Sequence, residues 1–378
     1  MTMLNRRTLR VKIMQSLFAY EQCKEANYVL AQDLVSERFS PDLNSMEVQD
    51  KPLLKEKRKE ALSLYKSHFG PKEAKESEDP QVNSVVAEGL GLFHNNNKKD
   101  YVFLKKNLVA EVGKINHWYY SVLGLLLVFE EVAKSDKKAN HANFLNNNFI
   151  AALRADRPLQ SVLLKANANW ENNRATAREW FHKVVKKDKA YQEYIKETHP
   201  DDNRQKDIIK HIVRKLILGA TVINDFFAEK DIRWAEDHDI VKSLVDKTLK
   251  SLTGEGAVQL QKLSLDWEDD LEFMNTLFEK TTQIGPANKD LIAANTKNWE
   301  VERLPLTDRV ILEMAITELI HFPAIPIKVT INEYIELTKN YSTPKSAKFV
   351  NGILDVMAKE LVATGVARKS GRGLIDNK

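Results

Sequence analysis

Cysteine is almost absent from this 378-residue sequence, in which Cys23 is the only example. One cysteine can form no internal disulfide, zinc knuckle or CxxC redox pair, so we expect a reducing compartment and a cytoplasmic protein. Glycine (13 residues) and proline (11 residues) are also scarce, which favours helices over turn-rich folds. The longest stretch without a charged residue, Ile115–Phe129, is shorter than the ~18 residues that a membrane span needs. We therefore predict no membrane partner.

The motifs of common enzyme classes are missing as well. The sequence has no GxGxxG or GxxxxGK[ST] loop to hold phosphates, and no HExxH or His-x-His pair to hold zinc. His117 beside Trp118 is typical of a partly buried structural imidazole. The acids Glu268–Asp270 offer oxygen ligands to a hard cation, but they also suit a helix start, where they complement the helix dipole. We predict no catalytic residue, no cofactor and no metal.

Positive charge is concentrated at the two ends of the chain. Residues 1–12 sum to +4 and residues 365–378 to +3, whereas the 352 residues between them sum to −3. Basic clusters on the first and last helices can attract the phosphates of single-stranded RNA, and a merely solvated face is the alternative for each. We expect the first cluster to project beyond the core, and Ser346 and Asn351 to offer directional hydrogen bonds. The predicted RNA-binding residues are Arg6, Arg7, Arg10, Lys12, Lys345, Ser346, Lys348 and Asn351.

Negative charge gathers in one internal segment. Residues 225–279 hold 14 acids and 6 bases, a net charge of −8. Such segregation steers oppositely charged partners, so we predict a basic protein partner, although a solvated acidic helix face explains the pattern equally well. The candidate docking residues are Asp237, Asp239, Asp269 and Asp270.

Apolar periodicity predicts an all-helical chain. Asparagine clusters at 95–97, 146–148 and 167–173 are expected to be caps and loops. In the last third, Thr330 and Glu333 fit a capping box, and Thr343 before Pro344 fits a helix start. The best-defined helices are expected at Asn5–Glu25, Lys55–Phe69, Asp100–Lys134, Leu306–Phe322, about 330–340, and from Thr343 onward.

Three nine-residue segments align without a gap at Asp207–Lys215, Asp239–Lys247 and Glu272–Lys280. Each begins with an acid, repeats the same apolar places, and is followed 27 or 28 residues after that acid by a tryptophan: Trp234, Trp267 or Trp299. A period of 32 to 33 residues is typical of stacked helical hairpins. The alternative is a chance alignment of amphipathic helices.

Four segments together resemble one known family. Arg6–Phe18 is similar to the arginine-rich first helix of the NusB transcription antitermination factors. Asp308–Leu319, Ile325–Leu337 and Lys348–Leu354 resemble the carboxy-terminal signature of that family in order and spacing. With the preceding helix from about Leu265, the resemblance covers about 115 residues at the two ends of the chain.

The resemblance implies a fold of two small helical bundles without catalytic activity. It also implies binding to boxA-type leader RNA, to a NusE-type small-subunit ribosomal protein, and to the RNA polymerase antitermination complex of bacteria. RNA contacts of the family carry over to Arg6, Arg7, Arg10, Lys345, Ser346 and Lys348. A central aromatic that the family uses for RNA has no clear counterpart near Asn288.

The chain is more than twice as long as the usual family member, so we expect a large insertion. The predicted organisation is a first helix at 1–25, a helical insertion at 26–264 with repeats at about 207–264, a helical bundle at 265–362 and a flexible basic tail at 363–378. One alternative is an RNA-modifying enzyme, since ribosomal RNA cytosine methyltransferases use the same helical fold, although their glycine-rich cofactor loop and reactive cysteine are missing here. The other is a scaffold that binds only protein.

Overall fold

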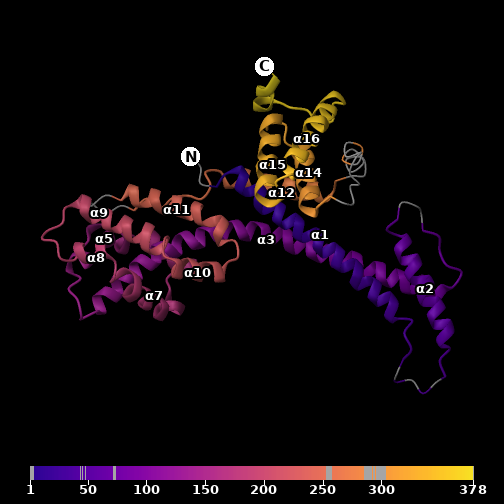
Figure 1. Cartoon of the computed structure of the whole chain (residues 1–378), viewed down its shortest axis with the longest axis horizontal. Helices are drawn as coiled ribbons and strands as arrows, with labels where there is room; N and C mark the ends of the chain where they lie inside the picture. The colour runs from indigo at the N-terminus through magenta and orange to yellow at the C-terminus, as the bar shows by residue number, and fades with distance from the viewer. Residues whose placement is uncertain are drawn as a thin grey trace. The chain divides into compact units, whose positions relative to one another are not determined.

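The computed structural model describes residues 4–252 apart from 43, 45, 47 and 71–73, together with residues 258–284, 292, 294 and 304–377. These residues contain helices and no strand, so the prediction of an all-helical fold is confirmed (Figure 1). Within the described ranges, no helix combines the length and apolar character needed to cross a membrane.

The helices vary widely in length. Two of them are much longer than average, α1 with 32 residues and α3 with 56. The α-helices are α1 (Arg6–Glu37), α2 (Lys51–Ser67), α3 (Pro80–Ser135), α4 (Ala142–Leu145), α5 (Asn148–Ala155), α6 (Arg157–Lys165), α7 (Arg174–Trp180), α8 (Lys189–Tyr194), α9 (Asp202–His211), α10 (Thr221–Lys230), α11 (Trp234–Ser251), α12 (Trp267–Thr282), α14 (Leu306–His321), α15 (Ile327–Tyr341) and α16 (Ser346–Ala363). Two π-helical turns, η2 (Phe181–Val185) and η3 (Ile212–Ile217), and two 3-10 helices, η1 (Glu171–Asn173) and η5 (Gly371–Asn377), complete the set.

The chain divides into two compact units. Unit 1 comprises Met1–Thr8 and Ala110–Asp270, and unit 2 comprises Leu9–Val109 and Leu271–Lys378. The boundaries fall inside α1, α3 and α12, so each of these helices contributes residues to both units.

Unit 1 is built around the second half of α3. Its residues 121–130 are all buried, which explains the long uncharged stretch in the sequence. Tyr119 reaches α11, where its hydroxyl lies 2.6 Å from Thr248 Oγ1, and Trp118 packs edge-on against Phe227 of α10. Short helices such as α5 and α9 pack on each other around this axis.

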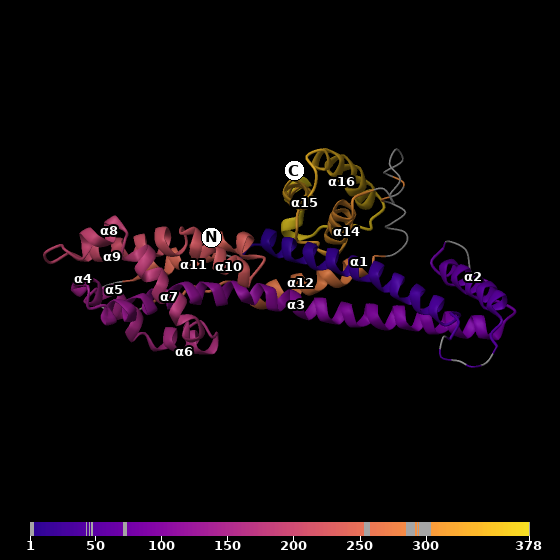
Figure 2. The ribbon, with the colours of Figure 1, turned by 60° about the horizontal axis from the view of Figure 1, so that its bottom comes forward.

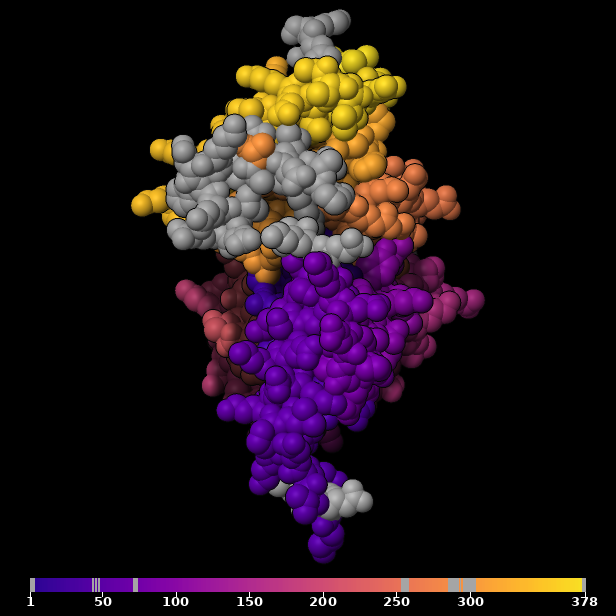
Figure 3. All heavy atoms as spheres, turned by 90° about the vertical axis from the view of Figure 1, so that its right-hand side faces the viewer, coloured from indigo at the N-terminus to yellow at the C-terminus, as the bar shows by residue number. Residues whose placement is uncertain are grey.

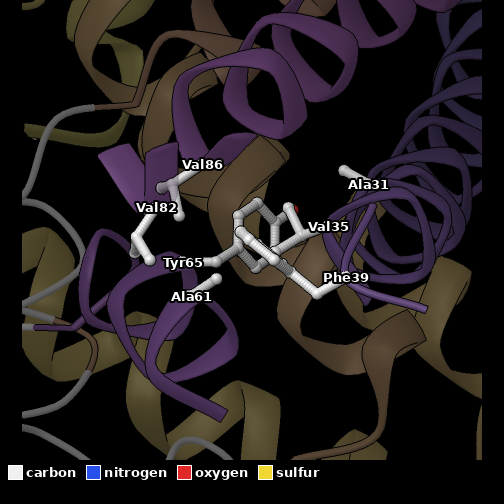
Figure 4. Packing of buried hydrophobic residues seen from close by; sticks show 7 residues of the cluster. All are labelled: Ala31, Val35, Phe39, Ala61, Tyr65, Val82 and Val86. Carbon is white, nitrogen blue, oxygen red and sulfur yellow. The ribbon is translucent and has the colours of Figure 1, made fainter. Parts of the chain in front are cut away.

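Unit 2 contains two packed regions. In the first, the end of α1, the helix α2 and the start of α3 share one apolar core, whose side chains converge in Figure 4. In the space-filling view, α2 and the adjoining part of α3 form a continuous face (Figure 3). The core residues are Ala31, Val35, Phe39, Ala61, Tyr65, Val82 and Val86.

In the second region of unit 2, α14, α15 and α16 pack pairwise as a three-helix group, and they lie together in both ribbon views (Figures 1 and 2). The capping box predicted for α15 is wrong. The helix begins at Ile327, so Thr330 lies inside it and is buried. The start of the last helix is close to the prediction, because the Thr343 hydroxyl accepts a hydrogen bond from the Ser346 backbone N–H.

The three aligned segments are all helical, but they do not form three equivalent hairpins. The first lies in α9 and η3 and is followed by α10, as a hairpin requires. The second lies in α11, and the described residues between it and α12, 252 and 258–266, contain no second helix of a hairpin. Trp234 and Trp267 do start successive helices, yet Trp234 is buried whereas Trp267 is 39% exposed. Trp299 lies outside the described residues, as does Asn288.

The basic tail was predicted to be flexible, but it folds back instead. Residues Gly371–Asn377 form η5, which packs against α15. The Ser370 backbone N–H donates to the Pro323 carbonyl at 3.0 Å, and Lys369 Nζ donates to the Phe322 carbonyl at 3.1 Å. Backbone acceptors in the α14–α15 turn therefore hold the tail on the helices of unit 2.

Candidate nucleic-acid interface

The first turn of α1 contains Arg7, the one exposed residue among the four cations of the first basic cluster. Asn5 caps this turn, because its Oδ1 accepts a hydrogen bond of 2.8 Å from the Thr8 backbone N–H. Arg7 is exposed, whereas Arg6 is partly buried and forms an ion pair with Asp269. Arg6 Nε also lies 3.7 Å from Asp270 Oδ1.

This ion cluster joins residues that the sequence assigned to two different surfaces. Arg6 was predicted to bind RNA, while Asp269 and Asp270 were predicted to bind a basic protein. Within unit 1, Arg6 contacts both acids. One cation and two acids leave a net charge of −1, so the cluster does not attract an RNA phosphate, and Arg6 weakens the attraction of the two acids for a basic partner.

One turn along α1, Arg10 is buried in unit 2, so the prediction that it projects beyond the core is wrong. Its guanidinium Nε and Nη2 each donate a 2.7 Å hydrogen bond to the carboxylate of Glu318 on α14. The same guanidinium lies 3.7 Å from Glu333 Oε2 and over the ring of Phe273, 5.5 Å from its centroid. Burial lowers the pKa of Arg10, but the charge and hydrogen bonds of Glu318, together with the charges of Tyr334 and Glu333, outweigh it and keep that pKa above its ordinary value.

Glu318 is the centre of a buried polar network that the sequence did not reveal. Besides Arg10, it accepts hydrogen bonds from Thr330 Oγ1 at 2.9 Å and from the Tyr334 hydroxyl at 3.1 Å. Burial and the negative charge of Glu318 raise the pKa of Tyr334 well above its ordinary value. The one available signal was an acid with the apolar residues Ala315, Ile316, Leu319 and Ile320 close on both sides, since buried acids require partners.

Lys12 is also buried, at 1% exposure. A lysine is seldom buried unless it is partnered, and in this position it cannot reach an RNA phosphate. Of the four cations predicted for the first helix, Arg10 and Lys12 therefore support the packing of unit 2, and Arg7 is the exposed one.

The residues predicted at the start of α16 differ in exposure. Lys345 and Lys348 are exposed, and Asn351 is partly buried one turn further along the helix. Ser346 is buried at 7% exposure and shares hydrogen bonds with the hydroxyls of Ser342 and Thr343. Its hydroxyl is therefore used inside the turn that begins the helix, so a direct RNA contact by Ser346 is not compatible with this conformation.

The predicted acidic docking residues also differ in how exposed they are. Asp239 is exposed and lies beside His238, whereas Asp237 is 1% exposed and cannot meet a partner. Asp269 is largely exposed, and Asp270 accepts a 2.6 Å hydrogen bond from Ser264 Oγ. Only Asp239 and Asp269 therefore offer accessible carboxylates.

Comparison with known proteins identifies one family. The model of the NusB family matches residues 233–359. The transcription antitermination protein NusB of Chloroherpeton thalassium is 37% identical over 142 residues, which cover 37% of this chain and 63% of that protein. The NusB protein of Salinibacter ruber is 41% identical over 104 residues, or 28% of this chain and 65% of that protein.

A third relative is covered more fully. The NusB protein of Pseudothermotoga lettingae is 36% identical over 105 residues, which represent 28% of this chain and 72% of that protein. The chain thus spans less than two thirds of the first two relatives and more than two thirds of the third. No solved structure matches.

Proposed function

Since this chain belongs to the NusB family, we propose that it is a non-enzymatic, RNA-binding factor of transcription antitermination. Its RNA ligand is a single-stranded boxA-type leader of ribosomal RNA, and its protein partner is a NusE-type ribosomal protein in the RNA polymerase complex. The three NusB relatives are named as antitermination proteins, which supports the coarse assignment.

The observation that carries the RNA proposal is the exposed basic start of α16. Lys345 and Lys348 project from a segment, Thr338–Leu354, that contains no acid. The segment lies within residues 233–359, which match the NusB family, and this supports a role for it in a function of that family. Lysines in such a segment attract RNA phosphates, and this attraction depends on salt. The logarithm of the affinity falls with the logarithm of the salt concentration, with a slope of about −0.7 per neutralised phosphate of a single strand.

The test is the affinity for a boxA-like RNA, measured against salt concentration with the NusE-type protein present. Lys345→Ala with Lys348→Ala is expected to lower affinity and to reduce the salt slope by about 0.7 for each lost phosphate contact. Arg7→Ala is expected to act in the same direction and more weakly. Lys98→Ala with Lys99→Ala, two exposed lysines on α3, is the matched control and should bind like the wild type.

Arg10 and Lys12 are left unchanged in this test, because replacing buried cations perturbs folding. RNA affinity that is identical for all variants would refute the proposed surface. Binding of the ribosomal protein without any RNA binding would instead favour the protein-only scaffold.

The acidic residues form a second, separate proposal for the basic partner protein. Asp239→Asn is the informative change, since Asp239 is exposed and makes no contact with Arg6. We expect weaker capture of the NusE-type protein by this variant at low salt. Glu179→Gln, an exposed acid of α7 far from the acidic segment in sequence, is the control. Equal capture by both would leave the partner to another surface.

A further inference from the structure

Unit 1 contains a cavity of about 340 Å³ whose lining comes entirely from residues before 232. It therefore lies outside residues 233–359, which match the NusB family, and its argument does not depend on the proposed function. Three segments line it: the middle of α3, the connection between α6 and α7, and the end of α10. Cavities of roughly 300–1,000 Å³ are the usual size of small-molecule sites.

Aromatic rings from all three segments line the cavity, and hydrogen bonds hold two of them in place. The Trp118 indole N–H donates to Asp231 Oδ2 at 2.8 Å, and the Trp170 indole N–H donates to the Ser121 carbonyl at 2.7 Å. Phe226 packs against Trp170 with ring centroids 5.7 Å apart. Because both indole N–H groups are satisfied by the protein, a ligand meets these rings as preformed apolar surface.

The connection between α6 and α7 is held in a strained conformation at this cavity. Asn167 has φ of 50° and Trp170 has φ of 62°, both in the left-handed region. In the described chain His199 is the only other non-glycine residue with positive φ. A non-glycine residue in this region is strained because its Cβ lies too close to the backbone, and such strain gathers where structure is tied to function. Here it places the Trp170 ring in the cavity wall.

Two lysines on different segments supply positive charge to the cavity. Lys114 of α3 is exposed and pairs with Glu111 at 2.6 Å. Lys230 of α10 is exposed, and its Nζ lies 5.5 Å from the centroid of the Phe226 ring. No described carboxylate pairs with Lys230, so its ammonium is available to an anion beside an aromatic surface.

Polar groups complete the lining between the rings and the lysines. Asp231 is buried, and its Oδ1 accepts the Arg233 backbone N–H while its Oδ2 accepts the Trp118 indole. His117 Nδ1 lies 2.8 Å from the Ala166 carbonyl, which requires the proton on Nδ1 and leaves Nε2 as an acceptor in the neutral ring. Asn173 adds an amide that both donates and accepts.

We propose that this cavity binds a nucleobase that carries a phosphate group, with the base against the aromatic wall and the phosphate at Lys114 and Lys230. Flat bases stack on aromatic side chains, and lysine binds phosphate as a point charge. The His117 and Asn173 groups can meet the polar edge of a base, whereas a purely apolar ligand would leave them unpaired. The two lysines disfavour a metal cation in the same cavity.

The experiment titrates full-length protein with adenosine, guanosine, cytidine and uridine 5′-monophosphates, and it follows tryptophan fluorescence because Trp118 and Trp170 line the cavity. We expect saturable quenching by at least one nucleotide, and about tenfold weaker binding of the matching nucleoside without phosphate. Lys114→Ala with Lys230→Ala should weaken binding about tenfold. Both lysines are exposed, so this variant should keep the wild-type circular dichroism.

Lys134→Ala with Lys165→Ala is the matched control, since both lysines are exposed in unit 1 and neither lines the cavity. A second arm replaces the mononucleotide with a single-stranded octanucleotide. Binding of the mononucleotide identifies a free nucleotide as the ligand, and lysine-dependent binding of the octanucleotide alone identifies a nucleotide within an RNA chain. The proposal is overturned if neither binds, if the Lys114/Lys230 variant binds like the control, or if phenyl phosphate binds as tightly as the best nucleotide.

Discussion

Arg10 is a residue whose role is interpreted differently from the sequence and from the structure. In the sequence it is one of four cations at a helix start, and the pattern favours a phosphate-binding surface. In the structure it is 2% exposed and bonded through two nitrogens to Glu318, which is itself fully buried. A buried ion pair of this kind is costly to break, because removing one partner leaves an uncompensated charge inside the protein.

Replacement of Arg10 should therefore affect stability before it affects RNA binding. We expect Arg10→Ala to lower the free energy of unfolding by roughly 3–5 kcal/mol, as for other broken buried pairs. Arg10→Met with Glu318→Gln should recover most of this loss, since the amide oxygen still accepts from Thr330 or Tyr334. Urea unfolding followed by circular dichroism measures both effects.

The exposed neighbour Arg7 provides the control for this comparison, and Arg7→Ala should change stability by no more than about 0.5 kcal/mol. A double variant as unstable as Arg10→Ala would show that lost packing, and not the unpaired Glu318, causes the damage.

At the scale of the element, α3 shows why the length of a helix could not be predicted from the sequence. The predicted helix covered Asp100–Lys134, and the observed one begins at Pro80. The asparagines at 95–97 suggested a break, but Asn97 is buried in the helix and accepts a 2.9 Å hydrogen bond from Asn27 of α1. Asn27 also donates to Asp100 at 2.7 Å. A weak helix former is tolerated at this position because its side chain has a partner on another helix.

Replacing either of two glycines of α3 by alanine is expected to change stability, in opposite directions. A Cβ on Gly124 would lie 2.3 Å from the Ala168 carbonyl oxygen, a backbone atom that cannot move aside cheaply. A Cβ on Gly113 would meet nothing within 4 Å. Gly124→Ala should destabilise by roughly 1–3 kcal/mol, despite the better helix propensity of alanine, and Gly113→Ala should stabilise by about 0.5–1 kcal/mol.

Thermal unfolding of the two alanine variants measures this difference. Since Ala168 lines the cavity of unit 1, Gly124→Ala should also weaken nucleotide binding there, while Gly113→Ala should leave it unchanged. Equal stability of the two variants would mean that the connection between α6 and α7 does not pack closely against α3 at Gly124.

At the scale of the whole molecule, the cores of both units contain buried tyrosines that link stability to alkaline pH. Burial raises the pKa of Tyr65 in unit 2 to about 12 and that of Tyr119 in unit 1 to about 12, from an ordinary value of 10.0. Each hydroxyl has a partner, since Tyr65 donates to the Tyr28 carbonyl and Tyr119 lies beside Thr248.

The sign of the linkage follows from these raised values. Between pH 10 and 12 the folded chain binds more protons than the unfolded chain. The contribution of each tyrosine to the free energy of unfolding is therefore complete below pH 10 and is lost as pH rises through 12. Each tyrosine contributes a slope of at most about 1.4 kcal/mol per pH unit. Urea midpoints at pH 8.5, 10 and 11 should fall accordingly.

Tyr65→Phe with Tyr119→Phe should flatten this dependence, at a cost of about 1 kcal/mol per lost hydrogen bond at pH 8.5. If the midpoints of the double variant fall as steeply as those of the wild type, other groups govern the alkaline loss of stability.

The sequence alone determined the all-helical class, the family resemblance and the approximate places of α14, α15 and α16, because apolar periodicity and helix-start signals are local. The tertiary structure decided which polar residues are accessible. Arg10, Lys12, Ser346 and Asp237 are buried, whereas Arg7, Lys345, Lys348 and Asp239 are exposed, and nothing in their neighbouring residues separates the two groups. The partner of Arg10 lies 308 positions away, and the cavity of unit 1 joins three segments spread over residues 114–231. Burial of a charge depends on such distant partners, and the pattern of apolar residues within one helix does not indicate them.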